Sequence, residues 1–198
     1  MNMKKLLALV LSLVMLLSLS AALAEETEYV FEAEYTELEG LEGLGVSGSP
    51  TGIGLVSEST KASNGYYVGN LGTSSPITFI INADTDAVAT LKMILGSNIL
   101  GNCAWNPTTL KIIVNGEAID YEEFTTDNGD DPMDQNNFKT KKIGDINLIA
   151  GENTLVIVAG ENTYRSNLPS APSIDAIKLT TTAVLEMVES EASHDELD

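Results

Sequence analysis

The feature that most constrains the fold of this chain is a succession of short β-branched and aliphatic runs separated by turn residues. Runs of this composition suit a pleated, buried sheet, in which side chains alternate between two faces. Between the runs lie Gly, Asn, Ser and Pro, the residues that form tight turns. The predicted strands are Tyr29–Tyr35, Gly52–Val56, Gly65–Leu71, Pro76–Asn82, Ala87–Leu95, Thr109–Asn115, Ala118–Tyr121, Ile143–Leu148, Thr154–Ala159 and Ser173–Leu179.

Two stretches carry the clearest local signals. Residues 87–95 alternate, with Leu91 and Met93 on one face and Lys92 on the other. The Asn115-Gly116 pair, which lies between two strand-like runs, is a strong signal for a two-residue hairpin turn. The chain has no convincing helical pattern. The sequence therefore predicts an all-β fold of two antiparallel sheets, a β-sandwich of the jelly-roll type.

The first 24 residues are expected to lie outside this fold. Residues 1–24 combine a basic start, an apolar run from Leu6 to Leu19 and a small-x-small site at Ala22–Ala24. That pattern predicts a signal peptide and a secreted, extracellular protein. The alternative is an uncleaved membrane anchor, because the apolar run is nearly long enough to span a bilayer.

The charge of the chain excludes several functions. It holds 29 acidic and 10 basic residues, with a net charge of −19. This balance argues against nucleic acid or a membrane surface as partner of the mature form, and it is compatible with bound divalent cations. With one cysteine and one histidine, His194, the chain offers no disulfide, no histidine zinc site and no Ser-His-Asp triad. We expect a monomer that is not an enzyme.

The mature chain is expected to hold one domain and a tail. The sandwich is predicted over residues 25–181, followed by an acidic tail over 182–198. A short helix through Val184–Val188 is an alternative, but the tail's composition favours disorder and a tail that folding does not require.

Three carboxylates need a compensating group. Strand alternation from Val30 to Tyr35 puts Glu32 and Glu34 on one face, with their Cα atoms about 7 Å apart. Asp175 shares a strand face with the core-type residues around it, and a buried charge is costly unless it is paired. The pattern is open to two interpretations, a solvated strand face or a calcium site built from hard oxygen ligands.

Five motifs in a fixed order resemble a known family. They are Phe31-Glu32-Ala33-Glu34, Lys61-Ala62-Ser63-Asn64-Gly65-Tyr66-Tyr67-Val68, Ile113-Val114-Asn115-Gly116, Leu148-Ile149-Ala150-Gly151-Glu152-Asn153-Thr154-Leu155 and Ser173-Ile174-Asp175-Ala176-Ile177-Lys178-Leu179. Together they resemble the carbohydrate-binding modules of families 6 and 35, galactose-binding-like jelly rolls carried by secreted polysaccharide-degrading proteins. The resemblance covers residues 29 to 180, nearly the whole predicted domain.

The resemblance implies a metal and a ligand. A structural calcium would be held by Glu32, Glu34 and Asp175, with backbone carbonyls from the loop Lys61–Asn64. A polysaccharide or oligosaccharide would bind at loops on one end of the sandwich. The residues implied there are Tyr67, with Tyr66 as a less favoured substitute, Trp105, Phe138 as the opposing ring, and Tyr164 with Asn167. The chain departs from the family 6 pattern at Ser173 and Ala176, where members often have an asparagine and an aromatic residue.

Two other functions remain open at this point. A small glycan-active hydrolase or lyase would need two carboxylates facing a groove, or a Tyr/Lys arrangement. A structural or adhesion module without a sugar site would instead use its acidic surface to contact a protein.

Overall fold

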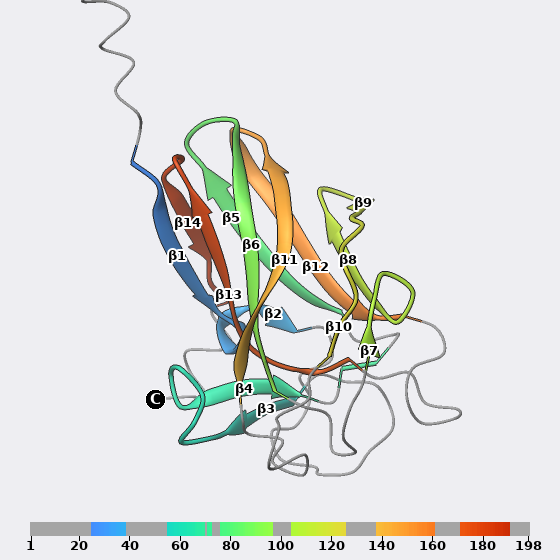
Figure 1. Ribbon diagram of the computed structural model, residues 1–198. Helices are drawn as coiled ribbons and strands as arrows, with labels where there is room; N and C mark the ends of the chain where they lie inside the picture. The colour runs from blue at the N-terminus through green and yellow to red at the C-terminus, as the bar shows by residue number, and fades with distance from the viewer. Residues whose placement is uncertain are drawn as a thin grey trace, which may run out of the picture.

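The chain folds into two antiparallel sheets that face each other as a sandwich (Figure 1). The computed structural model describes residues 25–38, 55–69, 71–72, 76–96, 104–125, 138–160 and 171–190. The predicted all-β class and the antiparallel sandwich are confirmed. No helix within these ranges is long and apolar enough to cross a membrane. The predicted signal peptide, residues 1–24, lies outside the described residues, so it stays a prediction.

Each sheet has six described strands. The first sheet has the order β11 (Lys139–Leu148), β6 (Ala87–Gly96), β13 (Ser173–Thr181), β4 (Tyr66–Gly69) and β3 (Leu55–Glu58), and β1 (Thr27–Glu32) also pairs with β13. The second has the order β14 (Leu185–Val188), β5 (Ile77–Ala83), β12 (Gly151–Ala159), β8 (Leu110–Val114) and β9 (Glu117–Ala118), and β2 (Glu37–Leu38) pairs with β5. A separate ladder joins β7 (Ala104–Trp105) to β10 (Phe124–Thr125).

The inward faces of the sheets supply the core. On β5 the residues Ile77, Phe79 and Ile81 are buried, and Leu91 and Met93 are buried on β6. The residues between them on each strand point outward and are only partly buried or exposed. Full burial of one such side chain contributes about 1.5–3 kcal/mol to the stability of the fold. Burial of the apolar residues at alternate positions is therefore the main driving force for the sandwich.

The Asn115-Gly116 turn forms as predicted. Both residues have positive φ, 51° at Asn115 and 84° at Gly116, which suits the tight turn between β8 and β9. The Asn115 side chain accepts a hydrogen bond from the Thr154 backbone N–H at 3.0 Å and donates one to Asn153 at 2.9 Å. The turn is therefore tied to β12 as well as to its own strands.

The first predicted strand ends earlier than expected. β1 stops at Glu32, and Ala33–Tyr35 form a short 3₁₀ helix. The Thr36 hydroxyl and backbone N–H both donate to the Ala33 carbonyl, at 2.7 and 3.2 Å, which closes this turn. Because the turn breaks the alternation, Glu34 does not share an exposed face with Glu32 but is fully buried.

The predicted tail boundary at residue 181 is wrong. Residues 182–190 continue the fold, because β14 pairs with β5. Ala183 and Leu185 are buried, with 1% and 6% of their surface exposed, and the backbone N–H of Val184 donates to Asp84 at 2.8 Å. Apolar residues at every second position give this segment one buried face despite its acidic composition. Residues 191–198, which include His194, lie outside the described residues.

We predict that Leu185→Ala destabilises the protein and that the neighbouring Val184→Ala does not. Leu185 is buried against the sandwich, whereas 62% of the Val184 side chain is exposed. Truncating a buried leucine costs about 2–5 kcal/mol. For a domain of this size that lowers the melting temperature by roughly 4–20 °C, at about 2–4 °C per kcal/mol. Equal melting temperatures for the two variants in a thermal melt would show that β14 contributes nothing to stability.

Candidate functional site

The loop between β3 and β4 is held in a fixed shape at the end of the first sheet. The Ser59 backbone N–H donates to the Gly65 carbonyl at 2.8 Å, and the Ala62 N–H donates to the Ser59 carbonyl at 3.2 Å. Gly65 has φ +88°, a conformation that favours glycine. The loop, residues 59–65, thereby presents Ser63 and Asn64 to β13 and to the end of β1.

Ser63 links two carboxylates that are far apart in sequence. Its backbone N–H donates to Asp175 Oδ1 at 3.0 Å and to Oδ2 at 3.2 Å. Its hydroxyl lies 3.1 Å from Asp175 Oδ1 and 2.6 Å from Glu32 Oε2. Asp175 is buried where the register of β13 against β6 shifts by one residue, between Ile174 and Ala176. This bulge explains how a carboxylate fits in a core strand.

Glu34 lies beside this pair and is incompletely satisfied. Asn64 Nδ2 donates to Glu34 Oε1 at 3.1 Å and to the Tyr35 hydroxyl at 2.7 Å. The other carboxylate oxygen, Glu34 Oε2, is buried and has no hydrogen-bond partner. An unpaired buried oxygen of an ionised carboxylate is costly, so this atom needs a proton or a cation.

Burial raises the pKa of all three carboxyl groups. Desolvation raises the pKa of Glu34 from its ordinary 4.5 to about 7, and the charges of Glu32 and Asp175 add to this rise. Desolvation also raises the pKa of Glu32 and of Asp175, although hydrogen bonds from Ser63 oppose it in both cases. The hydrogen bonds that Ser63 and Asn64 donate to these groups come from neutral hydroxyl, amide and backbone groups. The charge of Lys178 lowers the pKa of Glu32, but desolvation outweighs it.

The structure brings together the three predicted metal residues but does not make a finished metal site. Within the described ranges, no three His, Cys, Asp or Glu side chains form a group that could hold a metal. Ser63 instead occupies the space between Glu32 and Asp175 and hydrogen-bonds to both. The donor set, carboxylates beside a loop rich in carbonyl oxygens, has the hard-oxygen chemistry that calcium prefers. The unpaired Glu34 Oε2 and the raised pKa values indicate an unmet need for positive charge.

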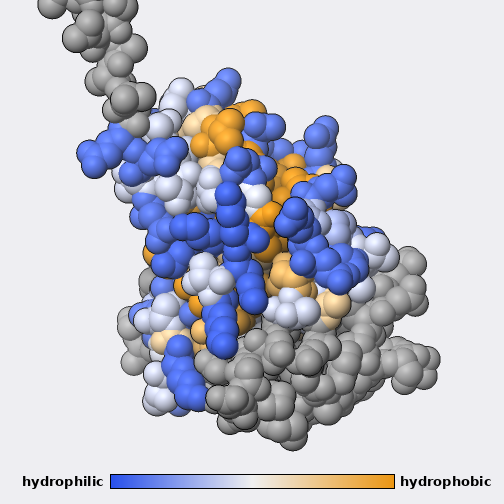
Figure 2. Space-filling model, in the orientation of Figure 1, coloured by the Kyte–Doolittle hydropathy of each residue, from blue (hydrophilic) through white to orange (hydrophobic). Residues whose placement is uncertain are grey.

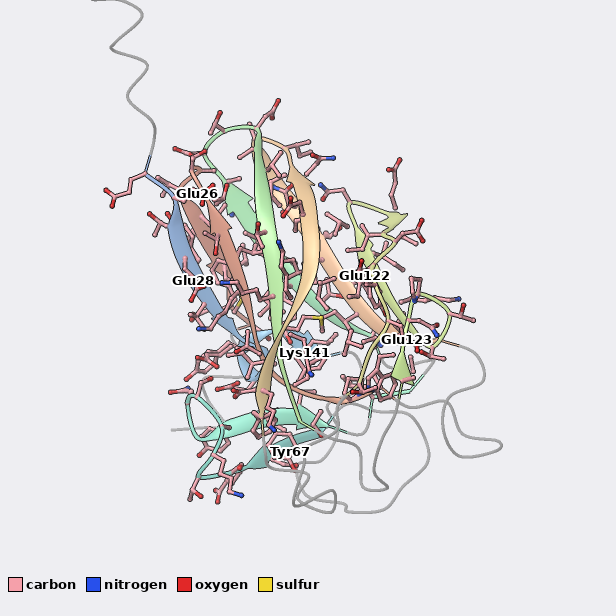
Figure 3. All side chains as sticks on the ribbon, viewed as in Figure 1. Glu26, Glu28, Tyr67, Glu122, Glu123 and Lys141 are labelled. Carbon is pink, nitrogen blue, oxygen red and sulfur yellow. The ribbon has the colours of Figure 1, made fainter. Side chains whose placement is uncertain are left out.

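Two of the predicted sugar-binding residues contact each other. The rings of Tyr67, on β4, and Phe138, just before β11, have centroids 5.2 Å apart and planes tilted by 53°. Both side chains are partly exposed. Figure 3 shows Tyr67 projecting from β4 at the lower end of the sandwich. We call these two rings the aromatic pair.

Small residues on the outward face of the first sheet allow the aromatic pair to meet. Gly96 and Ser173 are register partners, and Ser173 is adjacent to Gly69 on β4. A Cβ atom at Gly69 would lie 3.3 Å from the Tyr67 ring and 3.5 Å from Ser173 Oγ. One edge of the tyrosine ring therefore lies close to Gly69, where a larger side chain would push it away.

Trp105 does not form the exposed sugar-binding ring that the resemblance implied. The residue is fully buried and belongs to the hydrophobic core. It pairs with Phe124 across the β7–β10 ladder, and Phe124 contacts Tyr121 with ring centroids 5.9 Å apart. The Tyr121 hydroxyl donates to the Leu110 carbonyl, which holds this aromatic cluster against β8. A ring without exposed surface cannot stack on a sugar, so the expected role of Trp105 in the site is corrected.

The remaining predicted residues cannot be placed. Tyr164 and Asn167 lie outside the described residues, so their role stays a prediction. Sequence reasoning missed the side chains of Ser63 and Asn64, for which only backbone carbonyls were expected. It also missed Gly69. The Ser-Asn-Gly turn marked this loop, but its hydrogen bonds to distant carboxylates had no local signal.

Solved structures of carbohydrate-binding modules have a similar fold. The chain is similar to a Podospora anserina GH26-CBM35 β-(1,4)-mannanase, with 22% identity and a TM-score of 0.55 over 78% of this chain. It spans only 27% of that enzyme chain. This chain covers 97% of the length of each of two isolated modules. They are a family 35 module from Clostridium thermocellum, with 14% identity over 77% of this chain and a TM-score of 0.54, and one from Paenibacillus barcinonensis, with 22% identity over 76% and a TM-score of 0.52.

These similarities establish the fold, that of the family 35 carbohydrate-binding modules. No family model matches the sequence, and no curated protein matches it.

We predict that Glu34→Gln removes part of the pH dependence of stability when metal is chelated. Glu34 titrates at about 7 in the folded protein and has an ordinary value of 4.5. Between these values the folded state binds more protons than the unfolded state, so stability falls as pH rises. Thermal melts with chelator at about pH 5 and about pH 8 should show a smaller loss for the variant than for the wild type.

The matched control for that experiment is Glu186→Gln, which changes an exposed carboxylate on β14. It should lose as much stability with rising pH as the wild type. Parallel pH profiles for all three proteins would contradict the assigned titration of Glu34.

We also predict that Trp105→Ala strongly destabilises the protein. The indole is fully buried, and truncating a buried large aromatic costs about 3–5 kcal/mol. Chemical denaturation should show a lower midpoint with an unchanged slope. A midpoint equal to that of the wild type would mean that the ring is not part of the core.

Proposed function

We propose that this chain, which has the fold of the family 35 modules, is a secreted, non-catalytic carbohydrate-binding module. In this proposal it holds a structural calcium and binds a polysaccharide or oligosaccharide on the aromatic pair. The observation that carries the proposal is the contact between Tyr67 and Phe138, whose partly exposed rings lie 5.2 Å apart on one face of the sandwich.

The aromatic pair suits a sugar better than a purely polar surface would. A sugar hydroxyl gains little net free energy when it exchanges water for a protein hydrogen bond. Burial of the apolar face of a pyranose against an aromatic ring supplies the missing driving force. Ser173 lies next to the pair and offers a hydroxyl that both donates and accepts hydrogen bonds.

The spacing of the two rings determines how a sugar would bind. Two rings that enclose a sugar must be about 7–8 Å apart, because each contact takes about 3.5–4 Å. At 5.2 Å, Tyr67 and Phe138 are too close for that arrangement. We therefore infer that a sugar ring lies on the pair rather than between its members, so Phe138 widens the platform instead of opposing Tyr67.

The acidic cluster supports the calcium part of the proposal. Desolvation raises the pKa of Glu32, Glu34 and Asp175. The charge of Asp175 raises the pKa of Glu32 and Glu34 further. All three carboxylates accept hydrogen bonds from neutral donors. Calcium bound to these carboxylates and to oxygens of loop 59–65 would supply the missing positive charge. By fixing the loop, it would also fix the start of β4, which carries Tyr67.

Secretion and the absence of catalysis rest on the sequence. Residues 1–24 have the pattern of a signal peptide, and the only histidine is His194. Glu34 and Asp175, which are buried, and the half-buried Glu32 are held by Ser63 and Asn64, an arrangement that suits a structural role.

A glycan array on residues 25–198 tests the function. The wild type should bind at least one class of glycan, and Tyr67→Ala and Phe138→Ala should each lower that binding about five- to thirtyfold, since a stacked ring is worth roughly 1–2 kcal/mol. Tyr66→Ala is the matched control, because its side chain lies on the opposite side of β4 and is also partly exposed.

Three results of that array would decide against the proposal. They are no binding to any glycan, unchanged binding in Tyr67→Ala and Phe138→Ala, or loss of binding in Tyr66→Ala alone. The last result would place the sugar on the other side of β4. Thermal melts of each variant separate a lost contact from a lost fold.

A further inference from the structure

The outward face of the second sheet carries aliphatic side chains at positions where a solvated sheet carries polar ones. On β12, Val156 and Val158 point outward, and their neighbours in sequence point into the core and are also apolar. An antiparallel sheet with one face in water alternates apolar and polar residues, whereas strands covered on both faces read as continuous apolar runs. The apolar part of β12 therefore has the composition of a strand that is covered on both sides.

The strands beside β12 extend this apolar surface. Ile113 on β8 is the direct partner of Val156, and Val188 on β14 is the direct partner of Ile80 on β5. Direct partners lie side by side on one face, about 5 Å apart, and Ile80 is a diagonal neighbour of Val156. All of these side chains are at least partly exposed, Val188 to 46%. We call the five residues the aliphatic face: Ile80, Ile113, Val156, Val158 and Val188.

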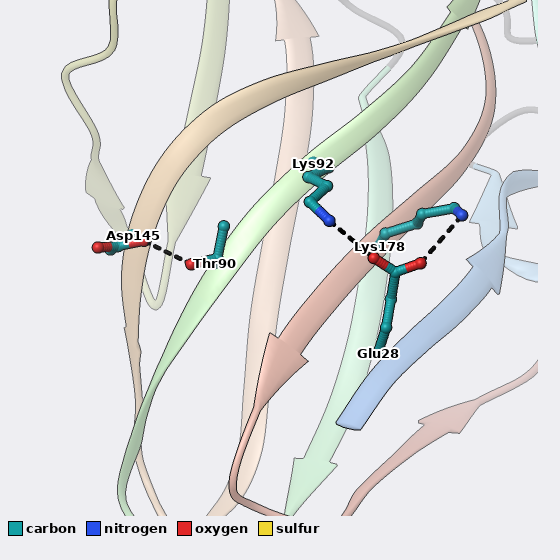
Figure 4. Close-up of polar contacts among 5 residues, drawn as sticks. All are labelled: Glu28, Thr90, Lys92, Asp145 and Lys178. Atoms are coloured by element: carbon teal, nitrogen blue, oxygen red, sulfur yellow. Dashed lines mark hydrogen bonds and ion pairs between the residues drawn. The ribbon is translucent and has the colours of Figure 1, made fainter. Parts of the chain in front are cut away.

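The outward face of the first sheet has the opposite character. Glu28 accepts from Lys92 Nζ at 2.7 Å and from Lys178 Nζ at 3.1 Å (Figure 4). On the same face the Thr90 hydroxyl donates to Asp145 at 2.7 Å. Figure 2 shows hydrophilic side chains across the middle of this face. Such groups are stable in water, so the difference between the two outward faces indicates that the second sheet meets a partner there.

The charges around the aliphatic face are separated by sign. The outward positions of β14, β5, β12 and β8 hold three charged residues. Glu152 and Glu186 lie at one end, where each is the direct partner of Asn82. Lys111 lies toward the other end, as the direct partner of Val158. The face therefore has an acidic end and a basic end, with aliphatic and threonine side chains between them.

This separation makes the face complementary to itself. A two-fold axis across the strands, near the middle of β12, would bring two copies face to face with their strands antiparallel. Each Lys111 would then lie against the Glu152 end of the other copy, while the aliphatic side chains meet in the middle. A two-fold interface makes every contact twice, so both ends of the interface are paired.

Charge favours a second copy over a basic partner. The chain carries a net charge of −19, so two copies repel each other at long range. At physiological ionic strength this repulsion is screened beyond about 8 Å, and contact chemistry then decides. On the aliphatic face two copies meet acid against base, whereas a basic partner would lie against Lys111 here.

The size of the face sets the expected strength of the contact. Four strands span about 19 Å, and seven residues along a strand span about 24 Å. The projected area is therefore about 450 Å² on each copy, or about 900 Å² in total, which is near the lower limit for specific interfaces. A weak dimer with a dissociation constant of about 10–100 μM is expected for such an area.

We propose that the aliphatic face is the contact between two copies of this chain, which form a two-fold dimer with antiparallel strands. The inference goes beyond the proposed function and does not depend on it. It departs from the monomer that was expected from the sequence.

The dimer has a consequence for ligand binding, which does rest on the proposed function. Antiparallel strands would place the aromatic pairs of the two copies at opposite ends of the dimer, each on an outer sheet. Two sites in that arrangement cannot bind neighbouring sugars of one chain. The dimer would instead join two separate polysaccharide chains.

The test is sedimentation equilibrium of residues 25–198 from about 1 μM to about 1 mM, a range that brackets the expected dissociation constant. The wild type should pass from monomer to dimer. Val156→Lys should raise the dissociation constant at least about tenfold, because it brings two like charges together in the middle of the interface. The change makes the chain less acidic, so added general repulsion cannot explain a loss of the dimer.

The matched control is Val88→Lys, the same change at a position on the outward face of the first sheet that is 58% exposed. It should keep the dissociation constant of the wild type. Thermal melts check the fold of each variant. Val188→Lys, on β14 at the margin of the aliphatic face, is a second variant that should weaken the dimer.

A charge exchange tests the antiparallel arrangement. Lys111→Glu should weaken the dimer about fivefold or more, since attraction at each end becomes repulsion. Lys111→Glu combined with Glu152→Lys should restore the dimer, because each end of the interface again pairs opposite charges.

Three results would overturn the proposal. They are a monomer at every concentration, a dimer that neither Val156→Lys nor Val188→Lys weakens, and no recovery in the charge exchange. The first would mean that another molecule covers the aliphatic face. None of these measurements uses a sugar, so their failure leaves the proposed function standing, and a failed glycan array leaves the dimer standing.

Discussion

The contact between Ser63 and Asp175 is the interaction on which the functional end of this protein depends. It joins residues 112 positions apart, a loop between two strands and a bulge in the central strand β13. Through the same serine it reaches Glu32 at the end of β1, and through Asn64 it reaches Glu34. Hydrogen bonds only partly offset the cost of desolvating these carboxylates. A bound positive charge would therefore stabilise the site.

The two faces of the first sheet carry different kinds of side chain. Inward residues such as Leu91 and Met93 form the core, and their neighbours in sequence form an outward surface. Register then decides which outward groups meet. The small residues Gly69 and Ser173 lie beside Tyr67 of the aromatic pair. Further along the same strands, Lys92 is the direct partner of Lys142 and of Lys178. A one-residue slip in β13 would disperse both features, and the bulge at Asp175 is what sets that register.

Local signals allowed much of the fold to be predicted, and tertiary contacts explain the errors. The strand at residues 87–95 and the Asn115-Gly116 turn form as expected because alternation and turn chemistry act over a few residues. The segment 182–190 had an alternating signal, but its acidic composition favoured a tail. Its pairing with β5 depends on a partner about 100 residues away, as the contact between Val184 and Asp84 shows.

The site was predicted less completely than the fold. The motif resemblance identified Glu32, Glu34 and Asp175, and the structure brings them together. The 3₁₀ turn that buries Glu34 is closed by local hydrogen bonds from Thr36 to Ala33, which strand alternation did not predict. The resemblance implied that Trp105 lies at the surface, among the sugar-binding loops. Its burial depends on Phe124, which follows it by 19 positions. Side-chain exposure in loops is set by such pairings, and no local pattern reports them.

Calcium titration at neutral pH tests the central claim most directly, that the cluster of Glu32, Glu34 and Asp175 is completed by a divalent cation. Calorimetry in two buffers of different ionisation enthalpy reports both binding and proton release. Because Glu34 titrates at about 7, calcium should bind one equivalent, release protons and raise the melting temperature. No binding, together with the same melting temperature in calcium and in chelator, would contradict the account.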